Sequence, residues 1–164
     1  METIVVNQFA PFLLINHLLP LLSRAGTTET SFIINVSAME GCFHHNKRGT
    51  HPHTNMAKAA LNMLTRTSGQ QMAKDHNCYM TSVDTGWVTD ELPLKKRVKA
   101  KILGLPGSKH TLQGEEHDER SEFAFHPPLD EVDGAARVLH PIWCGLKGHL
   151  FCGVFLKDYK IIDW

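Results

Sequence analysis

The pattern of apolar residues predicts a long buried helix and then a strand at the start of the chain. Residues 4–24 place apolar side chains on nearly every face of a helix, so we expect cover on two sides. After a polar turn, the run "SFIINVS" at 31–37 is continuous, apolar and rich in isoleucine and valine. Such a run is typical of a parallel strand that helices cover on both faces.

The remaining pattern repeats this alternation of helix and strand. A polar, histidine-rich loop at 42–53 precedes an alanine-rich helix at 54–75, and a second strand is predicted at 79–84. Residues 90–128 form a charged, lid-like loop with a basic and an acidic half. A helix within 127–146 and a strand at 149–156 complete the chain. The order predicts a single α/β domain over 1–164, with a parallel sheet and right-handed crossovers.

Composition narrows the possible partners and the compartment. Seventeen basic and seventeen acidic residues cancel, which excludes the positive excess that nucleic-acid binding requires. The four cysteines form no C-x-x-C pair, which favours reduced thiols and a cytoplasmic location. The apolar N-terminus lacks a basic leader and is interrupted by polar residues and two prolines, so we interpret it as a buried helix rather than a signal peptide or membrane span.

The polar loop carries a histidine cluster of the kind that can bind a metal ion. No cysteine or carboxylate completes a recognisable ligand spacing with these side chains, so we expect no metal. The cluster comprises His44, His45, His51 and His53.

Five segments in order resemble a known family. They are "VVNQFAPFLLINHLLPLL", "FIINVSAMEG", "NMAKAALNMLTRT", "SVDTGWVTDELP" and the stretch from "DGAARVL" through "GVFLKDYKIIDW". Together they resemble the C-terminal half of a short-chain dehydrogenase/reductase. The resemblance implies a partial doubly wound, Rossmann-like sheet that lacks the N-terminal glycine-rich half, and hence a truncated chain. None of the twelve glycines here makes the family's glycine-rich phosphate turn.

The resemblance also implies a reaction: hydride transfer between NAD or NADP and a small-molecule carbonyl or alcohol. In the family a tyrosine moves the substrate proton, and a lysine four residues later lies on the same helix face. Lys58 matches that lysine, but Thr54 stands at the tyrosine position. A threonine hydroxyl has a pKa far above the value of roughly 10 for a phenol, so it is a poor proton donor. His51 and His53 are alternative proton sources near neutral pH.

Other family positions are matched in part. Ala38 occupies the position of the serine that binds substrate in the family. Ser37 could take its place if the loop is shifted. The alternative is that the Ser37 hydroxyl bonds nearby backbone. Asn7 matches an asparagine that, in the family, kinks the preceding helix and holds a water linked to the lysine.

In the loop that binds the nicotinamide in the family, Gly86 and Val88 match the family's residues and Thr89 comes one residue early. For Gly86 a turn with positive φ would require the same residue.

Two hypotheses about function follow. One is an NAD(P)-dependent oxidoreductase of this family, impaired or inactive as this chain. The other is a non-catalytic scaffold or binding protein that retains the family's oligomer surface, formed by the helices at 4–24 and 54–75. Thr54, Ala38 and the missing glycine turn favour the second hypothesis, while Lys58 and Asn7 favour the first.

Overall fold

The computed structural model describes residues 1–25, 29–44, 46–47, 49, 51–88 and 129–164. The chain divides into one unit of Met1–Gly86 with Val132–Trp164 and another of Trp87–Glu131, of which only residues 87–88 and 129–131 are described. The predicted lid-like loop at 90–128 and the predicted cofactor residue Thr89 lie outside the described residues.

The chain begins with a nearly continuous helix made of three parts. These are α1 (Glu2–Ile4), the π-helix η1 (Val5–Phe9) and α2 (Ala10–Ala25). Then come β1 (Ser31–Ser37), the 3-10 helix η2 (Met39–Gly41), α3 (Pro52–His76) and β2 (Cys78–Asp84). The C-terminal part contains α5 (Glu131–Leu146), β3 (Phe155–Lys157) and β4 (Lys160–Ile162).

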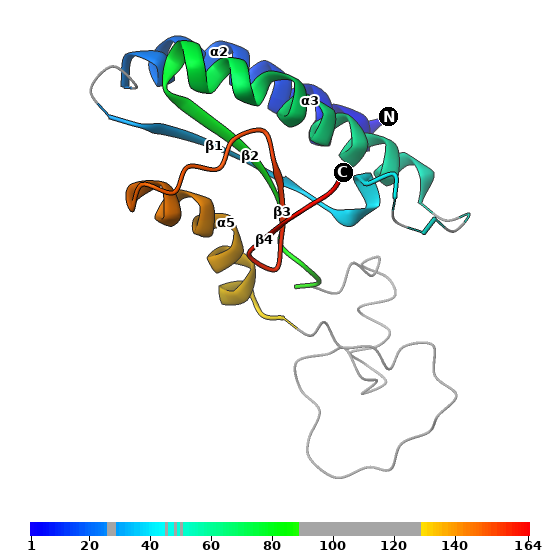
Figure 1. The fold of residues 1–164 in the computed structure, drawn as a ribbon. Coiled ribbons are helices and arrows are strands. Elements are labelled where there is room, and N and C mark those ends of the chain that lie inside the picture. The colour runs from blue at the N-terminus through cyan, green and yellow to red at the C-terminus, as the bar shows by residue number, and fades with distance from the viewer. Residues whose placement is uncertain (26–28, 45, 48, 50, 89–128) are drawn as a thin grey trace. The chain divides into compact units, whose positions relative to one another are not determined.

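The strands form one sheet in the order β1-β2-β3-β4. β1 pairs with β2 in parallel from Ser31↔Cys78 to Ser37↔Asp84, β2 pairs with β3 in parallel, and β3 pairs with β4 antiparallel. Helices α2 and α3 lie on one face of this sheet and α5 lies on the other (Figure 1). The predicted α/β fold, a mostly parallel sheet flanked by helices, is confirmed.

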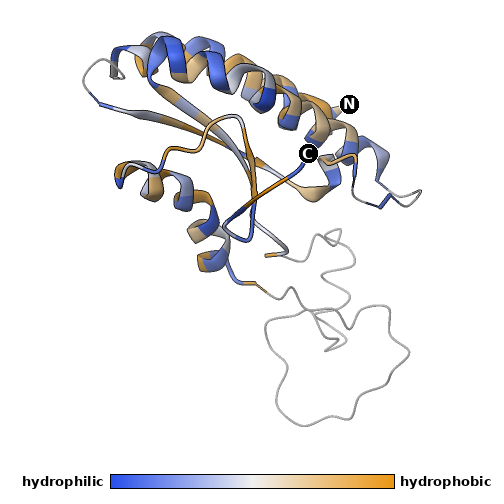
Figure 2. Cartoon of the chain, viewed as in Figure 1, coloured by the Kyte–Doolittle hydropathy of each residue, from blue (hydrophilic) through white to orange (hydrophobic). Residues whose placement is uncertain are grey.

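Alternation along the strands gives each face its own packing. Met72 of α3 packs with Cys78 and Met80 of β2, and partly buried residues of α2 close this core. On the opposite face, a Cβ placed on Gly145 of α5 would come within 2.4 Å of the Phe32 ring, so α5 sits directly on β1. Figure 2 shows the segment between α5 and β3 as largely hydrophobic, consistent with its course across the sheet.

The third strand was predicted at 149–156, but the structure forms β3 only at Phe155–Lys157. The preceding segment does follow β2: the Gly153 N–H donates to the Met80 carbonyl at 2.8 Å, and the Ser82 N–H donates to the Val154 carbonyl at 3.0 Å. Gly153 has a φ of 62°, a left-handed conformation that interrupts extended strand geometry. The prediction was therefore wrong about where regular pairing begins.

The fourth strand was not predicted from the sequence. β3 and β4 form a hairpin whose two central residues, Asp158 and Tyr159, have φ values of 47° and 67°. Positive φ at both positions is the requirement of a type I′ turn, which asparagine and glycine usually meet. The pair Asp-Tyr lacks that signature, so tertiary pairing determines the turn.

The helical segment Glu2–Arg24 is, among the described residues, long and apolar enough to cross a membrane, with a mean hydropathy of 1.5. None of its residues is buried within the structure. Core helices of water-soluble proteins and signal sequences share this length and composition. β1 and α3 cover one side of this helix, as predicted, whereas apolar residues on the rest of it, such as Leu13 and Leu21, are exposed in the part of the chain that the structure describes.

Gly69 provides a test of the close packing of α3 against the sheet. A Cβ at this position would lie 2.7 Å from the Gly153 Cα and 2.8 Å from its nitrogen, and backbone cannot move aside cheaply. We expect Gly69→Ala to lower the free energy of unfolding by about 1–3 kcal/mol. Urea unfolding followed by circular dichroism measures the change. Gly49→Ala, with nothing within 4 Å of its Cβ, is the control and should be nearly neutral.

Candidate functional site

A groove beside β1 brings together two of the predicted site residues. It has a volume of about 590 Å³ and is lined by side chains of the N-terminal helix and of β1. Asn7 and Lys58 both line it, although 50 residues separate them in the sequence. The remaining lining is mainly apolar.

Asn7 lies in the π-helical turn Val5–Phe9, where its side-chain amide donates to the Thr3 carbonyl at 3.0 Å. A π turn inserts an extra residue into a helix and is frequent at functional sites. The amide nitrogen is thus used within its own helix. The family resemblance implied a kinked helix at Asn7; the structure has a π turn there, and the water-binding role implied for Asn7 stays a prediction.

Lys58 lies in the second turn of α3 and reaches the end of β1. Its Nζ donates to the carbonyl oxygen of Val36 at 3.0 Å. The helix backbone at this point is pressed against η2, because a Cβ on Gly41 would come within 2.6 Å of the Lys58 carbonyl carbon. Gly41, whose role sequence reasoning missed, therefore allows the close approach that sets the position of Lys58.

Thr54 stands one turn before Lys58, as predicted, and is half-buried. Its hydroxyl donates to the carbonyl oxygen of His51 at 3.1 Å, within the first turn of α3. His51 precedes the helix with a φ of 57°, and His51 and His53 are both exposed, with ring centroids 6.3 Å apart. The threonine hydroxyl thus has a local helix-terminus partner, and two imidazoles are accessible nearby.

Ser37 points toward α3 rather than toward solvent. It is 4% exposed, and its hydroxyl donates to Asn62 Oδ1 at 2.5 Å. The Asn62 amide in turn contacts the Cys42 sulfur at 3.8 Å, and burial raises the pKa of the Cys42 thiol. Ser37 is therefore part of a buried polar contact between β1, α3 and the loop after β1.

A second buried polar network lies next to it. The Thr65 hydroxyl accepts hydrogen bonds from Asn35 Nδ2 and from the Ser82 hydroxyl, both at 2.8 Å, and donates to the Leu61 carbonyl at 3.2 Å. It thereby joins α3 to β1 and β2 at one point. Sequence reasoning missed this residue, although a threonine on the apolar face of a helix is a signal that could have indicated it.

The end of β2 is organised by Asp84, which sequence reasoning also missed. Its carboxylate accepts the Gly86 N–H at 2.6 Å and the Met39 N–H at 2.8 Å, and it lies 3.5 Å from Lys157 Nζ. Gly86 has a φ of 74°, in agreement with the alternative explanation that a turn requires glycine here, while its cofactor role stays a prediction. The carboxylate thus ties together the C-terminal ends of β1, β2 and β3.

The other two predicted cofactor residues are not placed relative to these side chains. Val88 is described but lies in the unit Trp87–Glu131, and Thr89 lies beyond the described residues. Within the part of the chain that the structure describes, no group of three or more His, Cys, Asp or Glu side chains could hold a metal ion. The four cysteines are free thiols.

Comparison with known proteins supports the fold. No family model matches the chain. It is 32% identical over 160 residues to an uncharacterized protein of Acanthamoeba polyphaga mimivirus, a match that covers 94% of this chain and 28% of the viral protein.

Three solved structures are similar over nearly the whole chain. They are the carbonyl reductase Sniffer of D. melanogaster (TM-score 0.64, 19% identity, 99% of this chain and 56% of that one), the NADPH-bound carbonyl reductase from chicken fatty liver (0.60, 25%, 96% and 52%) and a putative short-chain dehydrogenase/reductase from Burkholderia multivorans with bound NADP (0.57, 17%, 98% and 54%). The fold is Rossmann-like and similar to that of short-chain dehydrogenase/reductases. The chain spans just over half the length of these structures.

The contribution of Asp84 to the stability of the fold can be measured. Asp84→Ala removes the acceptor for the Gly86 and Met39 N–H groups and leaves Lys157 without this carboxylate. We expect the free energy of unfolding to fall by about 1.5–3 kcal/mol, the value of hydrogen bonds to a charged group. Chemical denaturation of wild type and variant tests this. Asp163→Ala, at an exposed carboxylate, is the matched control, and an equal loss in both variants would contradict the assignment.

Proposed function

We propose that this chain is an oxidoreductase-like protein of the short-chain dehydrogenase/reductase type, whose related chemistry is hydride transfer between NAD(P) and a carbonyl or alcohol. Similarity to two carbonyl reductases and to a structure with bound NADP supports the proposal. The quoted sequence segments further support its correspondence to the C-terminal half of that fold. On this proposal the residues present contact the nicotinamide end of the cofactor, not its phosphates.

The observation that carries the proposal is the arrangement around Lys58. Its ammonium group and Asn7 line one groove at the end of β1, and the Asn7 helix is distorted into a π turn there. The resemblance implied a lysine and an asparagine linked in one site, and this arrangement supports that expectation. One turn before Lys58, however, the hydroxyl of Thr54 is aliphatic and bonds the His51 carbonyl. A lysine without a neighbouring phenol can bind a ribose or an oxygen but does not supply the usual proton.

We therefore expect these 164 residues to bind nicotinamide nucleotides weakly and to show no measurable carbonyl reduction. A general acid typically contributes about 10²- to 10⁴-fold in rate, and Thr54 is a poor one. The experiment compares NADPH fluorescence titration and ketone-dependent NADPH oxidation for wild type, Thr54→Tyr and Lys58→Ala. Thr54→Tyr should not restore turnover, because weak cofactor binding limits activity first.

Lys74→Ala provides the control for that comparison, since Lys74 is an exposed lysine in the last turn of the same helix. Wild-type turnover that is lost in Lys58→Ala and kept in Lys74→Ala would overturn the inactive reading. It would mean that Ser37, Thr54 or a loop histidine transfers the proton. His51→Ala and His53→Ala would then separate these sources.

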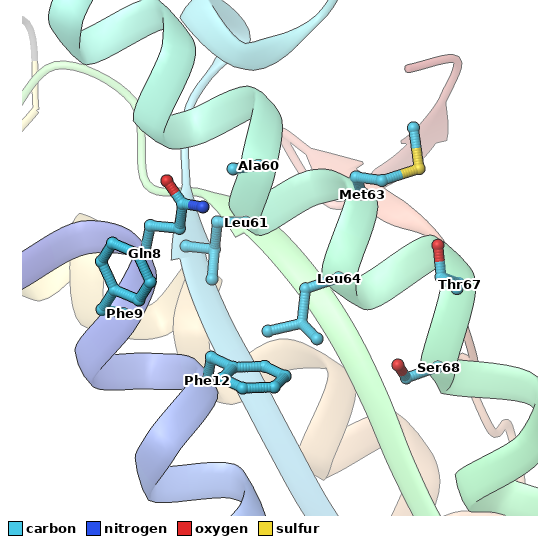
Figure 3. A pocket seen from close by; sticks show the side chains of 9 residues that line it. All are labelled: Gln8, Phe9, Phe12, Ala60, Leu61, Met63, Leu64, Thr67 and Ser68. Carbon is cyan, nitrogen blue, oxygen red and sulfur yellow. The ribbon is translucent and has the colours of Figure 1, made fainter. Parts of the chain in front are cut away.

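A second candidate function, a non-catalytic oligomerising scaffold, is favoured by the exposed face of the two long helices. Phe9 and Phe12 of the N-terminal helix are 52% and 47% exposed, and Met63 of α3 is 54% exposed. Figure 3 shows Phe12 beside Leu64 at a shallow pocket of about 450 Å³ between the helices. We propose that this surface mediates homo-oligomer formation, since large exposed apolar patches usually mark interfaces.

Light scattering after size exclusion tests the oligomer proposal. We expect wild type to elute as a dimer or larger, and Met63→Glu to shift it toward monomer by placing a charge in the interface. Leu146→Glu is the control, because Leu146 is 72% exposed on α5 and outside this surface. A folded wild-type monomer at tens of micromolar, or equal dissociation in both variants, would contradict the proposal.

A further inference from the structure

One flank of α5 carries a cysteine and a histidine in contact with each other. Arg137, His140 and Cys144 follow one another at spacings of three and four residues, so their side chains share this flank. The Cys144 sulfur lies 3.7 Å from His140 Nδ1 and 3.6 Å from His140 Nε2. A thiol and an imidazole at this distance can exchange a proton through either ring nitrogen.

This flank of α5 faces the hairpin of β3 and β4. The His140 ring packs on Tyr159 in the turn of that hairpin, and Arg137 lies 3.4 Å from the carboxylate of Asp158. The hairpin is at the β4 end of the sheet, and β1 is at the other end. The pair of Cys144 and His140 is therefore formed within the described residues and does not depend on what lies beyond β1.

Aromatic neighbours hold the His140 ring beside the sulfur. The ring packs edge-on against Tyr159, with centroids 5.0 Å apart and an interplanar angle of 73°, and its centroid lies 5.9 Å from that of Phe151. Tyr159 is itself held by the guanidinium of Arg137, 5.2 Å from its ring centroid. A base that is already oriented does not have to be ordered during the reaction, which distinguishes His140 from a freely solvated histidine.

The other three cysteines are in less reactive surroundings. Cys42 and Cys78 are fully buried, and burial raises the pKa of both thiols. Cys152 is half-buried, as Cys144 is, but burial raises the pKa of the Cys152 thiol as well. Because the thiolate is the nucleophilic form of cysteine, these three thiols should react slowly near neutral pH. Cys152 provides an internal control of similar accessibility.

We propose that Cys144 is a modification site, at which a low-molecular-weight disulfide such as glutathione disulfide forms a mixed disulfide with His140 as the base. The Cys144 thiol gives its proton to His140, and the sulfur attacks one sulfur of the disulfide. The disulfide bond of the reagent breaks as the new S–S bond forms, and the leaving thiolate takes the proton back from His140. Cys144 is oxidised and one glutathione is reduced, so no further oxidant is needed. The inference goes beyond the proposed function and involves neither cofactor nor turnover.

The position of Cys144 at the end of α5 makes its dependence on His140 testable. The Cys144 carbonyl accepts the N–H groups of Lys147 at 3.0 Å and His149 at 2.9 Å, which close the helix. The macrodipole disfavours an anion in the last turn of a helix, so a thiolate here needs a cation beside it. The Lys147 ammonium lies 4.6 Å from the centroid of the Trp143 ring. Protonated His140 is the cation in contact with the sulfur, and removing it should therefore suppress the reaction.

The experiment uses the reduced chain of 164 residues and glutathione disulfide at pH 7. Acid quenching and peptide mass spectrometry give the rate of modification at each cysteine. An ordinary cysteine is about 3% thiolate at this pH, so full activation accelerates the reaction by at most about 30-fold. We expect Cys144 to react at least about tenfold faster than Cys152 and the adduct to be released by dithiothreitol.

Two variants separate the imidazole from its packing. His140→Phe keeps a ring between Tyr159 and Phe151 but removes the base, and should lower the Cys144 rate by about tenfold. His149→Phe, at an exposed histidine five residues after Cys144, is the matched control and should leave the rate unchanged.

Three outcomes would overturn the proposal. They are a Cys144 rate no higher than that of Cys152, an unchanged or faster Cys144 rate in His140→Phe, and an internal disulfide in place of the glutathione adduct. Reaction at the buried Cys42 and Cys78 reports unfolding of a variant. If His140→Phe unfolds, the ratio of the Cys144 and Cys152 rates in wild type decides by itself.

Discussion

The packing of α3 against β1 and β2 is the interaction on which the rest of the structure depends. The Thr65 hydroxyl, fully buried, joins Asn35 of β1 and Ser82 of β2, while Met72 supplies the apolar contact to the same strands. Buried polar groups of this kind are costly when unpaired, so they fix one position of the helix along the sheet. At Gly69 the helix comes so close to Gly153 that a side chain has no room.

This packing also determines the positions of the side chains in the candidate site. Because Gly41 lets η2 press against α3, Lys58 reaches the Val36 carbonyl at the end of β1. The same geometry turns the Ser37 hydroxyl inward to Asn62. Lys58 and Asn7 therefore line one groove, whereas the hydroxyl of Ser37 donates to Asn62 of α3 and that of Thr54 donates to the His51 carbonyl. This arrangement is the basis of the proposal that the site holds a ligand oxygen rather than moving a proton.

Part of the apolar surface of the N-terminal helix and one side of β1 are not covered by other described residues. On the α2 side, apolar residues remain exposed along the helix. Among the described residues no strand pairs with the outer side of β1. An exposed helix face packs against other side chains, whereas a strand edge pairs with backbone.

The sequence by itself determined the class of fold and the location of most elements. The apolar run at 31–37 and the segment at 79–84 are strands within a residue of prediction, and the two long helices lie close to their predicted ranges. Burial of side chains against the sheet imposes such patterns on the sequence directly. The positions of Lys58 and Thr54 one turn apart also follow from helix geometry. Only the tertiary structure decided where β3 begins, that Asp158 and Tyr159 form a turn, and that Asp84 and Thr65 join the strands. These features depend on contacts between residues far apart in the chain, and such contacts leave no local pattern to read.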